Sequence, residues 1–489
     1  MRNAAKAEWN RGDLLAIPIL LLAVALRIAT AGYSLWFDEI AAIRLADQPL
    51  GLLWSGWMAR EANPPLYYTL LKGWMALFGA SDLAVQALSV AIGTAGIAAG
   101  WWLARRIGGT RAGLIAALLL ATSAAHVDFS QEVRGYILAQ TAGLFGCVAM
   151  VAYLERPRLA PLCGYALAAL VALYSHTTMI VFVGLINLAM AWLLRRDMPA
   201  LIRWIAVNAI VAILWTWWAW ISFGQAQAGG TGFSWIARPD VISALGMTAV
   251  IYLPFYVASE KVVLAPLLAL GWLAGAAWFA ARDRRPAVVL LAVLTVAAPV
   301  LLWALSQALP VFLPRTLFWA AGPMLVLLAV ALAGLSSPIR TALVVVLIAL
   351  QAGALLRWLP ERETEAWPRQ IAAIARIDPH AIVLVEGDAM AVATDHYLRR
   401  QAPGLRLVIL ERSGAVDRWA EGLASAPHVD AAGARALLVQ QRRVFTLTRG
   451  DYAPGTSLAA VGVERPLPEG PRQRQPALGL WRARPSPAR

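Results

Sequence analysis

Two adjacent carboxylates, Asp38 and Glu39, directly follow the aromatic residues Trp36 and Phe37 at the end of the first long apolar run. Ionised side chains next to hydrocarbon are costly, and they persist where they are paired, hydrated or functional. A carboxylate held at a membrane surface can take the proton of an attacking hydroxyl group. The pair therefore indicates acid–base chemistry, although the same acids would also suit the start of an interfacial helix.

Three further polar segments follow within the first 180 residues, at 61–68, 126–136 and 174–176. Acids, a cation and a histidine at one membrane surface suit a reaction in which a hydroxyl group displaces a phosphate from a carbon atom. A carboxylate accepts the proton of the hydroxyl group, and cations stabilise the departing phosphate. The candidate substrate-binding residues are Glu61, Asn63, Tyr67, Tyr68, Asp128, Glu132, Tyr136 and His176, and the cation among them is Arg134.

Structural roles remain open for the same residues. Tyr67 and Tyr68 would suit an aromatic belt at the membrane interface. Glu132 and Arg134 would form a structural pair at the end of a span, and His176 would be a hydrogen-bonded histidine at a hairpin tip. The sequence predicts no required cofactor, and a divalent metal ion has no support in it.

The composition predicts the elements that must position these residues. The 489-residue chain is 60% hydrophobic and 14% charged, whereas soluble domains are about 45–50% apolar and about 25% charged. The apolar residues form blocks of bilayer-spanning length, about 20 residues each. The net charge of +14 is scattered between these blocks, which excludes the continuous basic stripe of a nucleic-acid-binding protein. A polytopic α-helical membrane protein is therefore predicted.

Eleven spans are expected, and the shorter runs leave this number uncertain by about two. The predicted spans are 14–32, 82–104, 112–125, 134–154, 161–175, 177–194, 201–223, 262–281, 287–308, 316–334 and 339–357. A cytoplasmic N-terminus puts the basic clusters near residues 105, 156, 195 and 284 on the cytoplasmic face. The polar segments then lie on the extracytoplasmic side, and so does the chain after residue 360.

The chain after residue 360 is more polar, and its apolar runs are short enough for strands. Strands are predicted at 381–385, 405–410, 436–439, 444–447 and 478–481, with helices at 366–376 and 388–400. Alternating strands and helices indicate a small α/β domain. We expect residues 1–360 to form the catalytic membrane domain, and residues 361–489 to form an extracytoplasmic domain with a stabilising or acceptor-side role.

Five motifs occur in an order and spacing similar to those of a known family. They are Trp36-Phe37-Asp38-Glu39, Asn63-Pro64-Pro65-Leu66-Tyr67-Tyr68, Phe129-Ser130-Gln131-Glu132-Val133-Arg134-Gly135-Tyr136, Tyr174-Ser175-His176 and Pro314-Arg315-Thr316. Over about residues 10–360 the chain resembles the bacterial glycosyltransferase family 39 group, whose relatives include the protein O-mannosyltransferases and the aminoarabinose transferases of lipid A. The resemblance implies a GT-C fold, with many spans and a catalytic acid in the first exterior loop.

By this resemblance the enzyme would transfer a sugar, with inversion, from a polyprenyl-phosphate donor to a hydroxyl group of a lipid, glycan or protein in the bacterial inner membrane. Asp38 matches the position of the family's catalytic base, and Glu39 would position the acceptor or assist Asp38. The candidates for holding the donor phosphate are Arg134, Arg315, Lys261 and Lys72.

Two positions depart from the family pattern. Many relatives have His or Lys where Asn63 stands, and many have Tyr where Thr316 stands, which leaves the donor contacts less certain than the base. Lys72 and Lys261 would also serve simply by extending toward lipid headgroups, and Arg27 is expected to do so near the outer end of the first span.

A transporter or flippase for a lipid-linked or anionic substrate is the alternative function. Such proteins commonly have internal repeats, broken helices and polar residues at mid-membrane depth. The chain shows no repeat, and its polar segments gather toward one face. The glycosyltransferase is therefore the favoured interpretation.

Overall fold

The computed structural model describes residues 11–227, 236–254, 264–362, 365, 367–411, 420, 422–440, 443–449, 462–466 and 476–483. The chain divides into two compact units. The helical unit comprises Met1–Ala31 and Trp54–Pro360, and the sheet unit comprises Gly32–Leu53 and Glu361–Arg489. The segment that carries Asp38 and Glu39 thus packs with the C-terminal part of the chain.

The helical unit contains eight helical segments long and apolar enough to cross a membrane, counted over the described residues. They are η1–α1 (Arg11–Thr30), α5 (Asp82–Thr122), α7 (Tyr136–Glu155), α10 (Met198–Gln227), α12 (Ala265–Asp283), α13 (Pro286–Ala308), α14–α15 (Pro314–Ala333) and α16 (Ser337–Trp358). Three shorter apolar helices accompany them, α8 (Leu159–Ser175), α9 (Met179–Leu194) and α11 (Val241–Tyr252). All eleven predicted spans fall on these helices, and the polytopic helical fold is confirmed.

The other helical elements of this unit are η2 (Gly56–Arg60), α4 (Leu66–Phe78) and α6 (Ala124–Phe129). The turn η3 (Phe318–Ala320) lies inside the α14–α15 segment, and η4 (Leu359–Glu361) crosses from this unit into the sheet unit. The polar segment at 126–136 begins inside α6.

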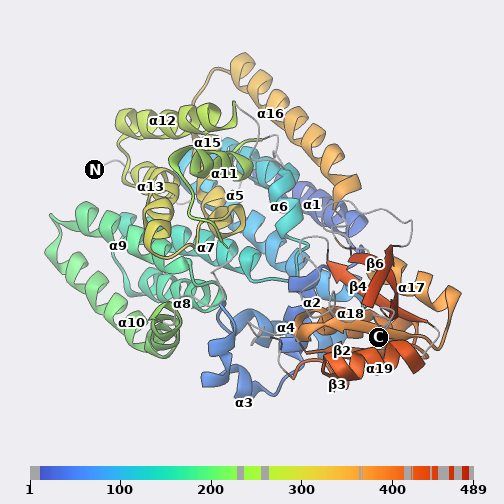
Figure 1. The fold of residues 1–489 in the computed structure, drawn as a ribbon. Helices are drawn as coiled ribbons and strands as arrows, with labels where there is room; N and C mark the ends of the chain where they lie inside the picture. Colours follow the sequence, from blue (N-terminus) through green and yellow to red (C-terminus); the bar gives the residue numbers. More distant parts are fainter. Residues whose placement is uncertain are drawn as a thin grey trace. The chain divides into compact units, whose positions relative to one another are not determined.

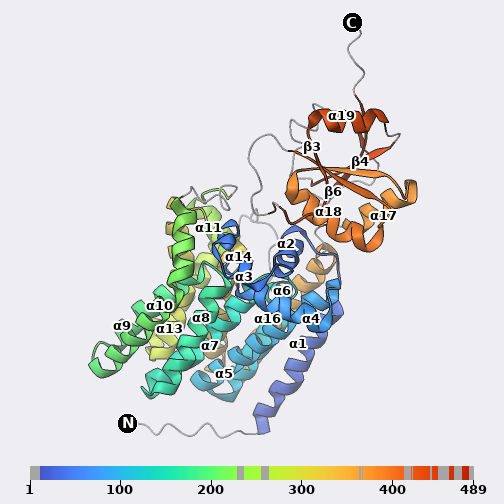
Figure 2. The same ribbon diagram turned by 90° about the horizontal axis from the view of Figure 1, so that it is seen from below.

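Two predicted spans, 82–104 and 112–125, lie in the single element α5, which is broken at Gly109. Gly109 has φ +81°, a left-handed conformation that glycine adopts without steric cost. The two halves then pack against each other, since Gly100 lies beside Leu120 and Gly113 beside Trp101. A helical hairpin results, and α1, α7 and α15 pack against it (Figures 1 and 2).

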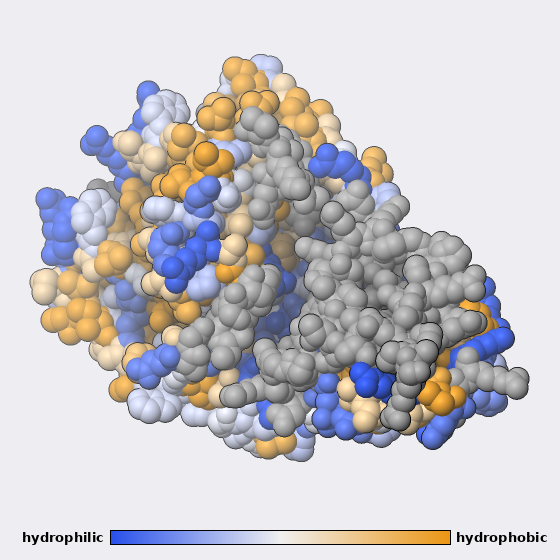
Figure 3. Space-filling view, in the orientation of Figure 1, coloured by the Kyte–Doolittle hydropathy of each residue, from blue (hydrophilic) through white to orange (hydrophobic). Residues whose placement is uncertain are grey.

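The outer surface of the helical unit is strongly apolar. Large hydrophobic side chains are exposed on many of its helices, for example Ile339, Val345 and Leu356 on α16, and Figure 3 shows hydrophobic residues over that helix. An exposed apolar surface of this extent is stable in hydrocarbon and unfavourable in water. The surface therefore fits the multi-pass membrane protein that the composition predicted.

Arg27 in α1 points into the helical unit, which corrects the expectation that it extends toward lipid headgroups. It is fully buried and donates to the carbonyl oxygens of Leu120 (3.3 Å) and Ala121 (3.1 Å) and to Nδ1 of His126 (2.8 Å). Carbonyls at the end of α5 have no partner within that helix. Arg27 satisfies two of them, so it joins α1 to the start of α6.

The described residues of the sheet unit form one six-stranded sheet in the order β3-β2-β1-β4-β6-β5. The strands are β1 (Ile382–Glu386), β2 (Arg406–Leu410), β3 (His428–Val429), β4 (Val444–Arg449), β5 (Gly462–Pro466) and β6 (Pro476–Ala483). The first four pair in parallel, with Ile382 opposite Arg406 and Val444, and β6 pairs antiparallel to β4 and β5. Helices α17 (Trp367–Ile377) and α18 (Gly387–Gln401) lie on one face of the sheet and α19 (Ala431–Gln440) on the other (Figure 2).

The alternation of side chains explains the two helical layers. Along β1, Ile382 and Leu384 join the hydrophobic cluster beneath α19, while Val383 and Val385 are equally buried on the opposite face. A parallel strand covered on both faces is apolar throughout. The small α/β domain is therefore confirmed.

One predicted strand was wrong, because residues 436–439 lie in α19. A run of four apolar residues has no periodicity that separates a strand from a buried helix. The short strand β3 and the strand β5 were not predicted.

Helices α2 (Phe37–Ala46) and α3 (Leu50–Leu53) belong to the sheet unit as well. Helix α2 packs against α18. Its apolar residues Ile40 and Leu45 are fully buried.

Candidate active site

Asp38 and Glu39 occupy the first turn of α2, but they have different surroundings. The Glu39 side chain is fully buried, and its Oε2 accepts a hydrogen bond from the backbone N–H of Trp36 at 3.1 Å. Successive residues on a helix point about 100° apart, since 3.6 residues make one turn. Asp38 therefore faces a different direction, and it is only half-buried. Glu39 caps its own helix, whereas Asp38 is the more accessible carboxylate.

The sheet unit holds α2 at both of its ends. At the start of α2, Glu365 Oε2 accepts a hydrogen bond from the N–H of Phe37 at 2.8 Å. Toward its end, Arg44 donates to Asp395 at 2.8 Å, and Asp395 also accepts from Arg399 at 2.7 Å. Burial lowers the pKa of Arg44, and the carboxylate of Asp395 opposes that change.

In the helical unit, Arg134 is at the centre of a buried polar cluster. Its guanidinium lies 3.4 Å from Oε1 of Glu61 and 3.3 Å from the hydroxyl oxygen of Tyr68. All three side chains are buried. Burial raises the pKa of the Tyr68 hydroxyl well above its ordinary value, and Arg134 opposes that rise. Tyr68 thus stays protonated, and it can donate a hydrogen bond.

Asn63 orients the Glu61 carboxylate. Oε1 of Glu61 accepts from the Asn63 backbone N–H at 3.2 Å and from Asn63 Nδ2 at 3.1 Å. Position 63, where many relatives are expected to have a cation, is therefore occupied by a neutral side chain that donates to the Glu61 carboxylate.

His176 follows α8 and is held by Thr178. The Thr178 backbone N–H donates to Nδ1 of His176 at 3.2 Å, which places the proton of the neutral imidazole on Nε2. The Thr178 hydroxyl lies 2.9 Å from the same Nδ1 and 3.1 Å from the carbonyl oxygen of Thr316. Thr178 therefore connects His176 to α14 (Pro314–Leu317), the helix that carries Arg315.

Two arginines act electrostatically on His176. Burial, followed by the charges of Arg134 and Arg315, lowers the pKa of His176 to about 3. The imidazole is therefore neutral at physiological pH. Its ring lies 5.2 Å from that of Tyr136, so the segments at 134–136, 176 and 315 converge in the helical unit.

The approach of these segments depends on Gly135. A Cβ atom at this position would lie 2.5 Å from the carbonyl oxygen of Ser175, which is closer than non-bonded atoms approach. A second tie joins the same region to the Glu61 segment, since the Thr177 hydroxyl donates to the carbonyl oxygen of Ala62 at 2.7 Å. The cluster is therefore built from three chain segments held by backbone contacts.

Tyr67 has a structural environment. Its hydroxyl lies 2.8 Å from Oγ of Ser89, which in turn donates to the carbonyl oxygen of Glu132 at 2.6 Å. Because Ser89 uses its proton there, Tyr67 is the donor to Ser89. Tyr67 joins α4 to α5 and fixes the backbone of Glu132, whose side chain is half-buried.

The remaining predicted residues are Asp128, Lys72 and Lys261. Asp128 is half-buried in α6, and Lys72 is half-buried in α4, one helical turn beyond Tyr68 and on the same face. Lys261 lies outside the residues that the structure describes. No group of three or more His, Cys, Asp or Glu side chains that could hold a metal ion occurs among the described residues.

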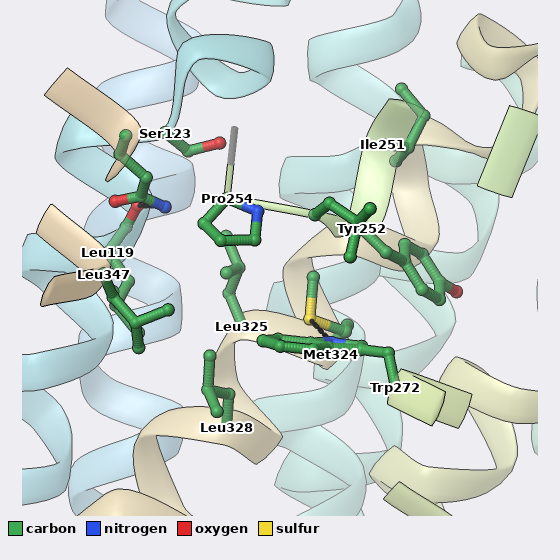
Figure 4. A pocket seen from close by; sticks show the side chains of 12 residues that line it. Leu119, Ser123, Ile251, Tyr252, Pro254, Trp272, Met324, Leu325, Leu328 and Leu347 are labelled. Carbon is green, nitrogen blue, oxygen red and sulfur yellow. Dashed lines mark hydrogen bonds between the residues drawn. The ribbon is translucent and has the colours of Figure 1, made fainter. Parts of the chain in front are cut away.

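A small pocket lies elsewhere in the helical unit, between α5, α11, α12, α15 and α16. Figure 4 shows Trp272 and Met324 side by side in it, and Trp272 Nε1 donates to the Met324 sulfur at 3.0 Å. Among the described residues, its lining is mostly apolar and contains no acidic or basic side chain.

Three residues with evident roles were not predicted from the sequence. Thr178 holds His176, Gly135 permits close approach, and Glu365 holds the start of α2. Gly135 and Thr178 lie within or beside predicted motifs, and their small or hydroxyl side chains were the available signal. Glu365 lies far from every motif, and no local pattern indicated it.

Comparisons with known proteins agree with this picture. Residues 62–220 match the family described as dolichyl-phosphate-mannose-protein mannosyltransferase. A search of the curated proteins finds no match.

Among solved structures, the chain is similar to ArnT from Cupriavidus metallidurans, in its apo state and in a structure described as bound to undecaprenyl phosphate. In each case the TM-score is 0.62 and the identity 15%, over 96% of this chain and 97% of that chain. Similarity at this identity establishes the fold. The shared fold and the family match over residues 62–220 confirm the predicted resemblance to GT-C glycosyltransferases of the family 39 type.

Proposed function

We propose that this protein transfers a sugar from a polyprenyl-phosphate donor to a hydroxyl acceptor, with inversion at the anomeric carbon. The observation that carries the proposal is the buried cluster of Glu61, Tyr68, Arg134 and His176, with Arg315 close enough to lower the pKa of His176. Arginine guanidinium groups and a tyrosine hydroxyl are donors suited to phosphate oxygens. The similar structure described as bound to undecaprenyl phosphate supports a donor of this class.

In the proposed reaction Asp38 is the general base. Its carboxylate takes the proton of the acceptor hydroxyl while that oxygen attacks the anomeric carbon. The bond between this carbon and the phosphate oxygen breaks, and polyprenyl phosphate leaves with the electron pair. The half-buried position of Asp38, against the fully buried Glu39, favours Asp38 for this role. Glu39 is assigned a positioning role, because its carboxylate caps α2.

The cations are proposed to hold the departing phosphate. Arg134 and Arg315 are the principal candidates, and the Nε2–H of the neutral His176 is a further donor. Lys72 shares a helix face with Tyr68 and is a secondary candidate, as is Lys261. Asn63 cannot supply a charge, so donor binding depends more heavily on the arginines.

The distribution of basic residues supports a location in the bacterial inner membrane with a cytoplasmic N-terminus. The polar segments of the first half and residues 361–489 would then be extracytoplasmic. The acceptor would be a lipid, glycan or protein hydroxyl group on that side.

Transfer by the purified protein in nanodiscs tests the proposal. The donors are radiolabelled undecaprenyl-phosphate mannose, glucose, galactose and aminoarabinose, and the acceptor is an envelope fraction from cells that lack the protein. We expect one donor to label a glycoconjugate that those cells have lost. Asp38→Asn, which keeps the side-chain shape, should abolish labelling while the protein remains folded. Labelling at the wild-type rate by this variant would exclude Asp38 as the base.

A further inference from the structure

We propose that Glu365 is a positioning residue for the transfer reaction, because it fixes the start of α2 and with it the carboxylate of Asp38. This inference rests on the proposed role of Asp38 as the base. It assigns part of the active-site architecture to the C-terminal half of the chain, 328 positions away in sequence from the amide that Glu365 binds.

The start of α2 has an unusual set of side-chain acceptors. The first N–H groups of a helix have no carbonyl partner within it. Here the N–H of Leu35 donates to the Tyr397 hydroxyl at 2.7 Å, and the N–H of Phe37 donates to Glu365 Oε2 at 2.8 Å. Between them, the N–H of Trp36 donates to Glu39 at 3.1 Å. The backbone N–H groups of three successive residues before Asp38 therefore donate to side chains. Two of these side chains belong to residues beyond 360.

Glu365 is itself held firmly. Its side chain is fully buried, and Oε2 also accepts from Nε1 of Trp367 at 2.7 Å, where Trp367 is fully buried as well. Its backbone carbonyl accepts from the Ser34 hydroxyl at 2.6 Å. A carboxylate removed from water is costly unless hydrogen bonds replace its hydration. Glu365 thus holds the chain before Asp38 at two points, Ser34 and Phe37.

Phe37 directly precedes Asp38, so the bond to Glu365 restrains the backbone that sets the direction of the Asp38 side chain. A general base must lie within hydrogen-bond reach of the proton it removes. A misplacement of about 1 Å can reduce a rate by about 100-fold. Removing Glu365 should therefore slow the chemical step more than it weakens donor binding.

The rest of α2 has independent anchors. Ile40, Ala42 and Leu45 are fully buried, and Arg44 is paired with Asp395 at 2.8 Å. Loss of the Glu365 side chain should therefore loosen the first turn while the helix stays docked in the sheet unit. This separates a positioning role from a general role in folding.

The experiment compares Glu365→Ala, Glu365→Gln and Tyr397→Phe with a control, Leu438→Ala. Leu438 is buried in the cluster beneath α19, so its truncation weakens the same unit without touching α2. Each full-length variant is assayed in nanodiscs with the undecaprenyl-phosphate sugar that gives the highest rate in the donor panel. Hydrogen exchange of the peptide covering residues 34–46 reports on the start of α2 independently of activity.

We expect Glu365→Ala to lower kcat by about 100-fold, with the donor KM changed by less than about 3-fold, and to speed exchange in this peptide. Glu365→Gln should restore most of the rate, because its amide oxygen can still accept from Phe37. Tyr397→Phe should give a smaller loss of the same kind, and it keeps the inference testable if Glu365→Ala fails to fold. Leu438→Ala should lower the melting temperature and leave kcat unchanged.

A double variant separates this inference from the function on which it rests. Adding Glu365→Ala to Asp38→Asn should cause no further loss of the residual rate, because the two residues act through one group. Wild-type kcat in Glu365→Ala and Tyr397→Phe, with faster exchange at 34–46, would overturn the inference and leave Asp38 as the base. Full activity of Asp38→Asn would instead refute the proposed function itself.

Discussion

Arg134 and Glu61 form a buried ion pair at 3.4 Å in the helical unit, and Arg134 also donates to the Tyr68 hydroxyl at 3.3 Å. A buried pair of this kind is weak evidence for stability, because desolvation offsets much of its attraction. When an anion binds, the Arg134 guanidinium and the Tyr68 hydroxyl can instead exchange their present partners for oxygen atoms of the anion. This exchange is the basis of the first prediction.

Arg134→Ala should weaken binding of undecaprenyl phosphate by about 10- to 100-fold, because a hydrogen bond to a charged group contributes about 1.5–3 kcal/mol. Arg134→Lys should recover only part of the lost affinity, since an ammonium group lacks the planar, two-pronged donor geometry of a guanidinium group. Binding to protein in nanodiscs provides the measurement. Arg203→Ala is the matched control, because Arg203 is exposed on α10, where it donates to the Pro199 carbonyl. Equal binding by both alanine variants would contradict the prediction.

Glu39→Gln should keep most of the transfer activity, in contrast to Asp38→Asn. The glutamine oxygen can still accept from the Trp36 N–H, so the cap of α2 survives, and loss of a cap costs only about 1 kcal/mol. The measurement is the initial rate of sugar transfer under the same donor panel, with the melting temperature as a check on folding. If both variants were equally inactive and folded, Glu39 would have a chemical role that its burial does not suggest.

Gly135→Ala should destabilise the protein and reduce donor binding. The added Cβ would meet the Ser175 carbonyl at 2.5 Å, and overpacking of this kind costs about 1–3 kcal/mol. Gly184→Ala is the control, because nothing lies within 4 Å of a Cβ at Gly184 in α9. In a helix, this second change should be neutral or stabilising by up to roughly 1 kcal/mol. Thermal unfolding in detergent compares the two, and similar effects would argue against close approach at Gly135.

The stability of the sheet unit should fall as the pH is lowered from about 6.5 toward about 3. Burial, followed by the charges of Arg400 and Arg44, lowers the pKa of His396 to about 3 from its ordinary value of 6.5. Below pH 6.5 the unfolded chain binds a proton that the folded unit excludes, so unfolding is favoured progressively until the folded pKa is reached. The slope contributed by one histidine is at most about 1.4 kcal/mol per pH unit.

Melting temperatures of the full-length protein between pH 8 and pH 4 measure this effect. His396→Asn should flatten the dependence, whereas His380→Asn, which alters an exposed histidine, should leave it unchanged. A wild-type pH dependence in His396→Asn would assign the effect to other groups.

Much of the fold follows from local patterns. The spans could be predicted because a bilayer requires long apolar segments, and the parallel strands near 382 and 406 because strands buried on both faces are continuously apolar. Failures occurred where the pattern was short, as at 436–439, which lies in α19. The hairpin of α5 was predicted as two spans because the basic residues around Gly109 interrupt the hydrophobic run.

The sequence by itself determined that the chain is a helical membrane protein and that its polar segments lie between apolar runs, and its family resemblance predicted Asp38 as the base. These properties depend on residue type and short-range order. Only the tertiary structure showed that Glu39 caps its own helix, that Thr178 holds His176, and that Glu365 binds the amide of Phe37. The bond to Glu365 joins residues 328 positions apart. Such contacts depend on how distant segments pack against each other. The sequence around either partner has no periodic pattern that would predict them.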